Sequence, residues 1–425
     1  MATAFAEAGT RLWVPARNAS FRLLWLGQSF SLLGDGFSYI AFSWITLSLT
    51  HSTLTLGYVL ALQAVPRALL TLVGGSLSDR WSARRLMSFS SWARAVVMGA
   101  VAVIGLSHLL SIWMLFVAAG VFGAVDAFFQ PARSSILPSV VPKDLLTSAN
   151  ALMGVGSRIS AVLGPAIGGL VVAASDANYA FLVDGVSFAI CGLCVSRVTT
   201  RPAPNPKPEP AAESAANPAS PPAPEEGMFA RIRTGLAIAW ADPRIRTMLA
   251  VDTAVTFCYA GPFTVGFADL AKFRLSGGST SLGLLDGALA GGAMLGALVG
   301  GMVGKQLKVG LLIAALAAWL AVGMALLGFT HNVVAAVAVV LAMGAAIGFQ
   351  GVFGMSWIQR NIHGSVLSRV ISVDMVFGYA AAPVSLVLCG GLAQARTDIM
   401  FVGTALILVV TALGVLSSGP VRAMQ

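Results

Sequence analysis

Twelve long apolar runs constrain the fold of this chain more than any other feature. A helix needs about 20 apolar residues to cross a bilayer, and runs of that length recur along almost the whole sequence. Their Ala, Leu, Gly and Val content is typical of helices and not of the alternating strands of a membrane barrel. The predicted fold class is an all-α polytopic membrane protein with 12 transmembrane helices. We expect the spans at 20–49, 53–79, 83–107, 110–138, 144–174, 178–198, 243–273, 279–304, 308–329, 331–361, 365–395 and 398–418.

A polar segment divides these spans into two sets of six. Residues 199–227 are rich in Pro, Ala and Glu and cannot bury a core, which indicates an extended, disordered tether. Apolar residues then recur at helical spacing over 228–241, as in an interfacial helix. The chain therefore divides into three predicted parts: a six-helix bundle over 1–198, a cytoplasmic linker with its interfacial helix over 199–241, and a second six-helix bundle over 242–425.

The positions of the cations predict the topology. Of the 26 lysines and arginines, twenty fall on the side of the N-terminus and three on the opposite side. Because cytoplasmic loops are enriched in positive residues, we expect a multi-pass protein of a bacterial-type inner (plasma) membrane with both termini cytoplasmic. The net charge of +9 then reflects topology, and no nucleic-acid partner is expected. The remaining three cations lie within spans: Arg67, Arg94 and Arg158.

A charged loop follows the second span. It carries Gly75, Asp79, Arg80, Arg84 and Arg85 between two apolar runs. Glycine allows close helix packing, the aspartate can lie at a neighbouring helix N-terminus, and the arginines can meet carboxylates or lipid phosphates. We expect a latch that ties the two bundles together at the cytoplasmic end. The alternative is a basic loop that only sets topology.

Twelve spans in two sets of six, a central tether and this loop resemble the major facilitator superfamily. The loop matches the family pattern G-x-x-x-D-R-x-G-R-R, except that its last two arginines are displaced by one position and no glycine precedes them. Together with the segments 21–28, 33–35 and 129–133, it is similar to the drug:proton antiporter branch that contains macrolide-efflux and enterobactin exporters. The resemblance implies two bundles built from inverted repeats that alternate around a midplane site.

The fifth span carries a second motif of the family. Where antiporters have G-x-x-x-G-P-x-x-G-G, this chain has Ser160 in place of the first glycine. Gly-Pro bends a helix and paired glycines permit close packing. We therefore expect this span to rock against its neighbours, although Gly and Pro are common in membrane helices generally. The matching residues of the motif are Gly164, Pro165, Gly168 and Gly169.

Five ionisable side chains lie near mid-membrane in the first half, where facing lipid would cost each about 2.5–3.5 kcal/mol or more. Asp126 and Arg158 are predicted neighbours because a short loop joins spans four and five. An ion pair would hold Asp126 charged, as a gate or substrate-sensitive pair, whereas a proton carrier must be free to lose its charge. We therefore predict that Asp35 carries the proton, with Arg67 and Arg94 as further buried charges. The alternative is a set of static pairs that only orient helices.

Aromatic and amide side chains provide a candidate cavity wall. An apolar wall with few polar groups suits amphiphilic compounds better than sugars. Asp184, in the sixth span, is expected to be structural because that span is peripheral in relatives, while Asp286 is expected to cap, pair or face water nearer a span end. By resemblance, the spans that line the cavity supply Phe37, Phe257, Phe263, Phe349, Gln350, Phe353, Trp357, Phe377 and Tyr379.

The predicted function is proton-coupled export of amphiphilic small molecules, such as drugs, macrolides or siderophores, by an antiporter of the multidrug-efflux type. Its expected partners are the substrate, protons and membrane lipids, and it is expected to act as a monomer without cofactor or metal. A dedicated lysophospholipid or siderophore carrier without proton coupling remains an alternative, as does a membrane sensor. No nucleophile–base or paired-carboxylate constellation favours an enzyme.

Overall fold

The computed structural model describes residues 13–80, 82–200, 243–302, 309–361 and 364–417, with the backbone alone at 72–80, 243–245, 248, 309, 354–361 and 364–372. Within these ranges, twelve helices are long and apolar enough to cross a membrane. They correspond one by one to the spans expected from the sequence, and the described residues contain no strand. The predicted all-helical fold class is confirmed.

The first half contains six spans. A short 3₁₀ turn, η1 (Val14–Arg17), precedes them, and another, η2 (Lys143–Leu145), leads into the fifth. The fourth span is divided into two helices by a two-residue break. The helices are α2 (Ala19–Thr50), α3 (Thr53–Arg80), α4 (Ala83–Leu106), α5 (Ile112–Asp126) with α6 (Phe129–Val140), α7 (Leu146–Ala174) and α8 (Ala177–Ser196).

The second half also contains six spans. Its first span changes from α-helix to π-helix twice, and single π-turns are often found at functional sites. This span comprises α10 (Pro243–Gly261), η3 (Pro262–Gly266), α11 (Phe267–Asp269) and η4 (Leu270–Arg274). The others are α12 (Ser279–Met302), α13 (Val309–Phe329), α14 (Val333–Asn361), α15 (Gly364–Ala395) and α16 (Thr397–Ser417).

Polar side chains fix where several helices begin. The side chain of Asn18 accepts hydrogen bonds from the backbone N–H groups of Ser20 and Phe21 at the start of α2. Asp176 accepts in the same way from the N–H of Asn178 at the start of α8. These caps satisfy backbone donors that the first helical turn leaves free. At the other end of α2, His51 takes a left-handed conformation with φ of 51°, which ends the helix.

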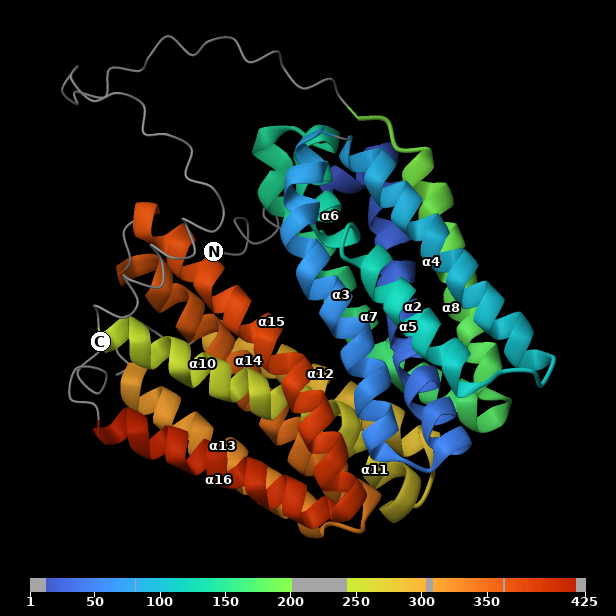
Figure 1. Cartoon of the computed structure of the whole chain (residues 1–425). Helices are drawn as coiled ribbons and strands as arrows, with labels where there is room; N and C mark the ends of the chain where they lie inside the picture. Colours follow the sequence, from blue (N-terminus) through green and yellow to red (C-terminus); the bar gives the residue numbers. More distant parts are fainter. Residues whose placement is uncertain (1–12, 81, 201–242, 303–308, 362–363, 418–425) are drawn as a thin grey trace.

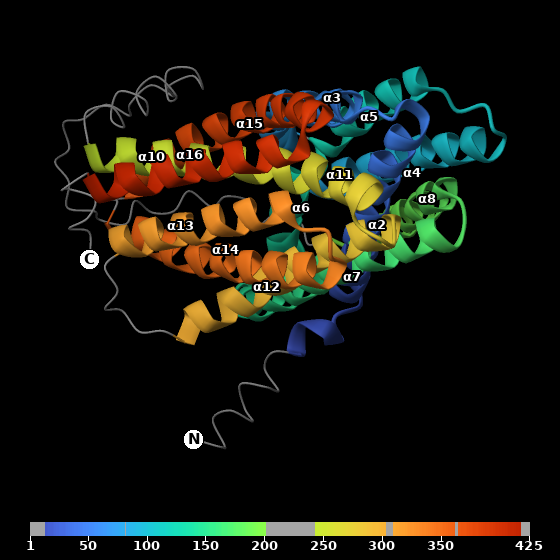
Figure 2. The same ribbon diagram turned by 90° about the horizontal axis from the view of Figure 1, so that it is seen from below.

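The helices form two groups that follow the two halves of the sequence (Figure 1). Within the first group α2 packs on α7 and α8, and α4 packs on α8. Within the second, α12 packs on α14 and α13 packs on α16. The two groups meet along two helix pairs, α3 with α15 and α7 with α12 (Figure 2). These pairs place α2 and α7, which carry the predicted proton carrier and the family motif, beside the boundary between the halves.

The described contacts between the halves lie toward one end of the molecule, which we call the closed end. It is the end where α3 and α12 begin and where α7 and α15 finish. Here the hydroxyl of Thr53 donates to the carbonyl oxygen of Gly390 at 2.9 Å, and the N–H of Thr53 donates to Oε1 of Gln394 at 2.8 Å. Toward the opposite end the ribbons of the two halves diverge (Figure 1).

Glycines bring α7 and α12 into direct backbone contact at the closed end. A Cβ atom at Gly169 would lie 2.5 Å from the carbonyl oxygen of Ser279 and 3.0 Å from the Cα of Gly283. A Cβ atom at Gly283 would collide with the carbonyl oxygen of Pro165. Since real Cβ atoms do not approach so closely, only residues without a side chain allow this packing.

Candidate functional site

Arg94, on α4, is the centre of a buried charge network in the first half. Its side chain is fully buried, and its Nη1 donates to Oδ1 of Asp126 at 3.0 Å. The guanidinium lies between two aromatic rings, 4.1 Å from the centroid of Phe129 and 4.2 Å from that of Phe188. The carboxylate and the two π faces compensate a charge that would otherwise be very costly to bury.

Asp126 bridges two arginines. Its Oδ2 lies 3.1 Å from Nε of Arg67, on α3, while its Oδ1 accepts from Arg94. Asp126 is the last residue of α5, directly before the break that separates this helix from α6. The carboxylate is therefore held from two helices and is 9% exposed. Of the predicted buried charges, Arg67 and Arg94 both belong to this network.

The predicted pair between Asp126 and Arg158 is wrong, because Asp126 is paired with Arg67 and Arg94 instead. Arg158 is exposed on α7. Two residues further on, Ser160 is buried and donates its hydroxyl hydrogen to the carbonyl oxygen of Ser29 on α2. Positions i and i+2 of a helix point in nearly opposite directions, so Arg158 faces away from the network.

Asp35, on α2, is the least tightly held carboxylate of the network. Its Oδ1 lies 3.8 Å from Nη1 of Arg94, which is an ion pair but too long for a hydrogen bond. Its side chain is 37% exposed, compared with 9% for that of Asp126. Asp35 is therefore close enough to Arg94 to feel its charge and open enough to exchange a proton with water.

The network continues along α2 and α6 through residues that were not predicted as site residues, although segments 21–28 and 129–133 carry part of the family resemblance. Nε of Arg133, on α6, donates to Oε1 of Gln28 at 3.0 Å. Gln28, Ser31 and Asp35 share one face of α2 because they are spaced at i, i+3 and i+7. Nε2 of Gln28, Oγ of Ser31, and Nε and Nη2 of Arg94 are buried without a hydrogen-bond partner in the described part of the chain. The helical spacing of Gln28 and Ser31 before Asp35 was the signal that could have identified them.

Most of the predicted latch lies outside the described side chains. Gly75, Asp79 and Arg80 fall in the part of α3 for which only the backbone is described. Arg84 donates from Nη1 to the carbonyl oxygen of Val198 at 2.9 Å, so it binds its own half. Arg85 is exposed. The latch remains a prediction for the first three residues.

The motif of the fifth span packs on two different helices. Cβ atoms at Gly164 and Gly168 would lie 2.7 Å from the carbonyl oxygen of Leu33 and 3.1 Å from the Cα of Phe37, both on α2. Gly169 and the carbonyl of Pro165 face α12 of the other half. The motif therefore joins α2, which carries Asp35, to the boundary between the halves.

The candidate cavity residues are distributed between the interior and the surface. Phe37 and Phe263 are 3% and 4% exposed and pack in the apolar core, so they do not form an open wall. Phe377 and Tyr379 are both 37% exposed. The side chain of Trp357 is not among those that the structure describes. The remaining candidates are partly buried: Phe257, Phe349, Gln350 and Phe353.

Asp286, on α12, is a carboxylate at the boundary whose environment the sequence did not reveal. Its Oδ2 is buried and has no hydrogen-bond partner among the described residues. Tyr39 of the first half and Tyr259 of the second are close enough to interact with its charge. Tyr39 crosses the boundary, because its hydroxyl donates to the carbonyl oxygen of Thr264 at 3.1 Å. Asp286 is therefore a second polar position beside the boundary.

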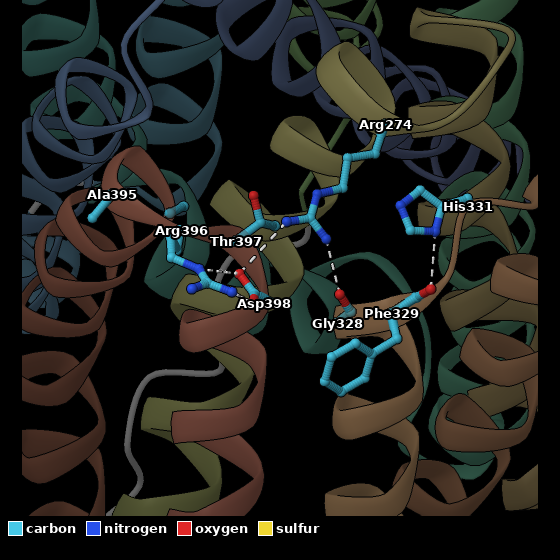
Figure 3. Close-up of a pocket in the computed structure, with 9 residues that line it drawn as sticks. Arg274, Gly328, Phe329, His331, Ala395, Arg396, Thr397 and Asp398 are labelled. Carbon is cyan, nitrogen blue, oxygen red and sulfur yellow. Dashed lines mark hydrogen bonds and ion pairs between the residues drawn. The ribbon is translucent and has the colours of Figure 1, made fainter.

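A cavity of about 510 Å³ opens at the closed end and is lined only by residues of the second half (Figure 3). Arg274 donates to the carbonyl oxygen of Gly328 at 2.9 Å and lies 3.7 Å from Oδ1 of Asp398. Arg396 also binds Asp398. Both arginines are engaged within the second half, and this cavity belongs to a different part of the molecule from the Arg94 network.

The fold and its boundary define a polytopic membrane protein of two six-helix halves with charges buried in the first. A sequence model of the Major Facilitator Superfamily matches residues 24–386, and the chain belongs to that family. It is therefore a membrane transporter and not an enzyme. This confirms the resemblance that the loop and span motifs indicated.

Relatives agree with this assignment, and a solved structure has the same fold. The multidrug efflux pump Tap of Mycolicibacterium fortuitum is 26% identical over 85% of this chain and 86% of its own length. The macrolide efflux protein A of Streptococcus pyogenes is 23% identical over 42% of this chain and 44% of its own. The staphyloferrin A transporter of Staphylococcus aureus is 27% identical over 37% of this chain and 40% of its own. The crystal structure of the nucleoside transporter NupG matches 94% of this chain and 98% of its own, with 12% identity and a TM-score of 0.72.

Proposed function

We propose that this protein exports amphiphilic small molecules across a bacterial-type inner membrane in exchange for protons, with Asp35 as the proton carrier. The observation that carries the proposal is the contrast between the two carboxylates that share Arg94. Asp126 is paired on both oxygens and nearly buried, whereas Asp35 is 3.8 Å from the same cation and 37% exposed. A group that must bind and release a proton has to reach water and must not be locked in a tight ion pair.

Proton binding at Asp35 changes the charge of the network by one unit. With Asp35 ionised, Arg67 and Arg94 balance Asp35 and Asp126, and these four charges sum to zero. With Asp35 protonated, the first half gains a net positive charge beside the boundary. A conformational equilibrium whose two states stabilise that charge differently will respond to protonation. Proton entry can drive the cycle in this way without a further cofactor.

The contacts at the closed end are the natural gate of such a cycle. The pairs α3–α15 and α7–α12 hold the two halves together through backbone contacts and the hydrogen bonds of Thr53. In alternating access these contacts break as contacts form at the opposite end. The proposal includes a cytoplasmic location for both termini, which makes the conformation described here closed toward the outside.

The substrate class is inferred from the relatives and from the residues at the boundary. Two of the relatives are named as efflux proteins for multiple drugs and for macrolides. Partly buried aromatic side chains on α10 and α14, with one amide, provide mainly apolar contacts. A monomer within the lipid bilayer is sufficient for this activity, because each half contributes to the boundary.

A dedicated siderophore carrier is the second candidate. It is supported by the relative named as a staphyloferrin A transporter, which aligns with little more than a third of this chain. A lysophospholipid carrier without proton coupling would use the same boundary. Neither alternative requires Asp35 to exchange a proton, so a test of proton coupling distinguishes them from the main proposal.

Proteoliposomes with an imposed proton gradient test the proposal. We expect gradient-dependent movement of an amphiphilic dye by the native protein, while Asp35→Asn retains substrate exchange without a gradient but loses the response to it. Asp144→Asn, at an exposed position before α7, is the matched control and should behave like the native protein. Gradient-driven transport that survives Asp35→Asn would exclude Asp35 as carrier. Movement of a siderophore or lysolipid alone, without a gradient, would favour the second candidate.

A further inference from the structure

Asp184, on α8, is a fully buried carboxyl that the proposed transport cycle does not use. It is 0% exposed and forms no ion pair with any described residue. Its described side-chain contacts are the hydroxyl groups of Ser38, on α2, and Ser187, on α8 itself. A buried carboxylate without a cation is among the costliest groups that a protein can hold, so the charge state of Asp184 requires an explanation.

The hydroxyl hydrogens around Asp184 are too few for an ionised carboxylate. Ser38 and Ser187 have one each, whereas a carboxylate presents about four acceptor sites. The hydroxyl of Ser38 also donates to Sδ of Met98, at 3.3 Å. The hydroxyl of Ser187 donates to the main-chain oxygen of Asp184 at 2.7 Å, which is closer than its 3.2 Å contact with Oδ1. Both hydrogens therefore already have another acceptor.

A neutral carboxylic acid needs fewer donors than a carboxylate and fits these groups better. The Ser38 hydroxyl donates to Oδ2 when Asp184 is ionised. In the neutral acid the contact reverses: the O–H on Oδ2 donates to Oγ of Ser38, and the hydrogen of Ser38 is free for Met98. Ser187 remains free to donate to the main chain. No donor or acceptor is used twice, and no charge is buried. The shortage of donors and the absence of a paired cation among the described residues therefore favour the protonated form of Asp184.

The packing of α8 on α2 keeps water away from this acid. Gly34 of α2 lies directly against it, because a Cβ atom at this position would collide with Oγ of Ser187 and with Oδ1 of Asp184. The residue after Gly34 is Asp35, and Ser38 follows one turn later on the same helix. The acid is consequently sealed against the helix segment that carries the proposed proton carrier.

The charged groups that face Asp184 are Asp35 from α2 and Arg94 from α4. Arg94 is already engaged by Asp126, and its charge and that of Arg67 are balanced by Asp126 and Asp35. An ionised Asp184 would add an unbalanced negative charge and would repel Asp35. The partly exposed Arg133 binds Gln28 and acts on Asp35, so it does not compensate Asp184. The two carboxyls are therefore coupled, and ionisation of one opposes ionisation of the other.

We propose that Asp184 is a second proton-binding site, which holds a proton in this conformation and is coupled to Asp35 through Ser38 and the shared face of α2. The first half then carries at least one neutral carboxyl whenever Asp35 is ionised. Proton binding at Asp184 does not depend on the proposed transport function. A transporter without proton coupling would bury the same acid in the same form.

Infrared spectroscopy of the purified full-length protein in detergent tests this site without any transport. We expect a protonated-carboxyl C=O band at neutral pH that shifts in D₂O and loses intensity in Asp184→Asn. Asp35→Asn should retain this band, and Asp144→Asn, which removes an exposed carboxylate, should leave this C=O band unchanged. An Asp184→Asn spectrum with the full native band, or a loss of ionised carboxylate bands in its place, would overturn the proposal.

Two serine variants keep the test decisive if Asp184→Asn does not fold. Ser38→Ala removes the acceptor of the acid hydrogen, so the C=O band should change frequency while its intensity is preserved. Ser187→Ala should move it less, because the 3.2 Å contact with Oδ1 is the weaker one. A band that neither variant moves would not come from Asp184, and the proposal would be rejected.

Discussion

Arg94 is fixed by Asp126, with 3.0 Å between Nη1 and Oδ1, in a part of α4 that no solvent reaches. The structure thereby distinguishes two carboxylates, Asp126 and Asp35, that the sequence alone does not distinguish. Asp126 compensates the buried cation, and Asp35 lies farther from the same guanidinium. A closely held carboxylate and a more distant one thus share one arginine.

Asp126→Asn is expected to destabilise the protein by about 3–5 kcal/mol, because it leaves the buried charge of Arg94 without its partner. The measurement is the unfolding midpoint in detergent, followed by circular dichroism or tryptophan fluorescence. Arg67→Gln is the control, since Arg67 is 46% exposed and its removal should cost no more than about 1 kcal/mol. Equal midpoints for native protein and Asp126→Asn would show that Arg94 finds compensation elsewhere.

The sequence predicted the spans well because hydrophobic length is a property of each segment by itself. The same sequence placed Asp126 beside Arg158 on the basis of chain proximity alone. Whether an arginine on α7 points inward depends on its angular position, and the buried Ser160 two residues later fixes that angle only once α7 is packed on α2. The partners of Asp126 come from α3 and α4, whose placement no local pattern reports.

The predicted cavity wall was partly wrong for the same reason. Aromatic residues such as Phe37 and Phe263 are typical of a binding surface. However, α7 approaches α2 closely at Gly168, and Phe37 is therefore enclosed in the core. Asp184 was expected only to be structural, and its complete burial was not predicted. Its hydrogen-bonding partner on α2 depends on how closely Gly34 lets α8 approach, which is a tertiary property.

Gly283→Val is expected to open the closed end. Its side chain would collide with the carbonyl of Pro165 on α7, and such overpacking costs about 1–3 kcal/mol, or roughly 5- to 150-fold in a conformational equilibrium. Spin labels at Leu109 and Thr330, on a background without the four native cysteines, would report a longer distance between the halves.

Gly403→Val is the matched control for that experiment. A Cβ atom at Gly403, on α16, would meet nothing within 4 Å, so the label distance should stay as in the parent protein. A Gly283→Val protein with the parent distance would mean that α7 and α12 move together during the cycle, contrary to the proposed gate.

Asp79→Asn tests the predicted latch. We expect the transport rate to fall about tenfold, because a charge-assisted hydrogen bond worth about 1.5–3 kcal/mol would be lost from one conformation only. Substrate affinity, measured by dye binding in detergent, should change less than about twofold, since Asp79 lies near the end of α3, away from Arg67 and Asp126. A native transport rate would reduce this loop to a topology signal.

Asp286→Asn should discriminate between substrates by charge. Oδ2 of Asp286 is buried without a hydrogen-bond donor from the described residues, and Tyr39 and Tyr259 are close enough to interact with its charge. A carboxylate at such a position attracts a cationic group but gives a neutral group no comparable electrostatic stabilisation. We expect efflux of a cationic dye to fall about tenfold, equivalent to about 1.4 kcal/mol, with efflux of a neutral dye of similar size nearly unchanged.

Tyr259→Phe is the control variant. It keeps the aromatic ring and the charge of Asp286 and should therefore transport both dyes at close to the native rate. If Asp286→Asn slowed both dyes equally, the residue would act on the conformational cycle and not on recognition.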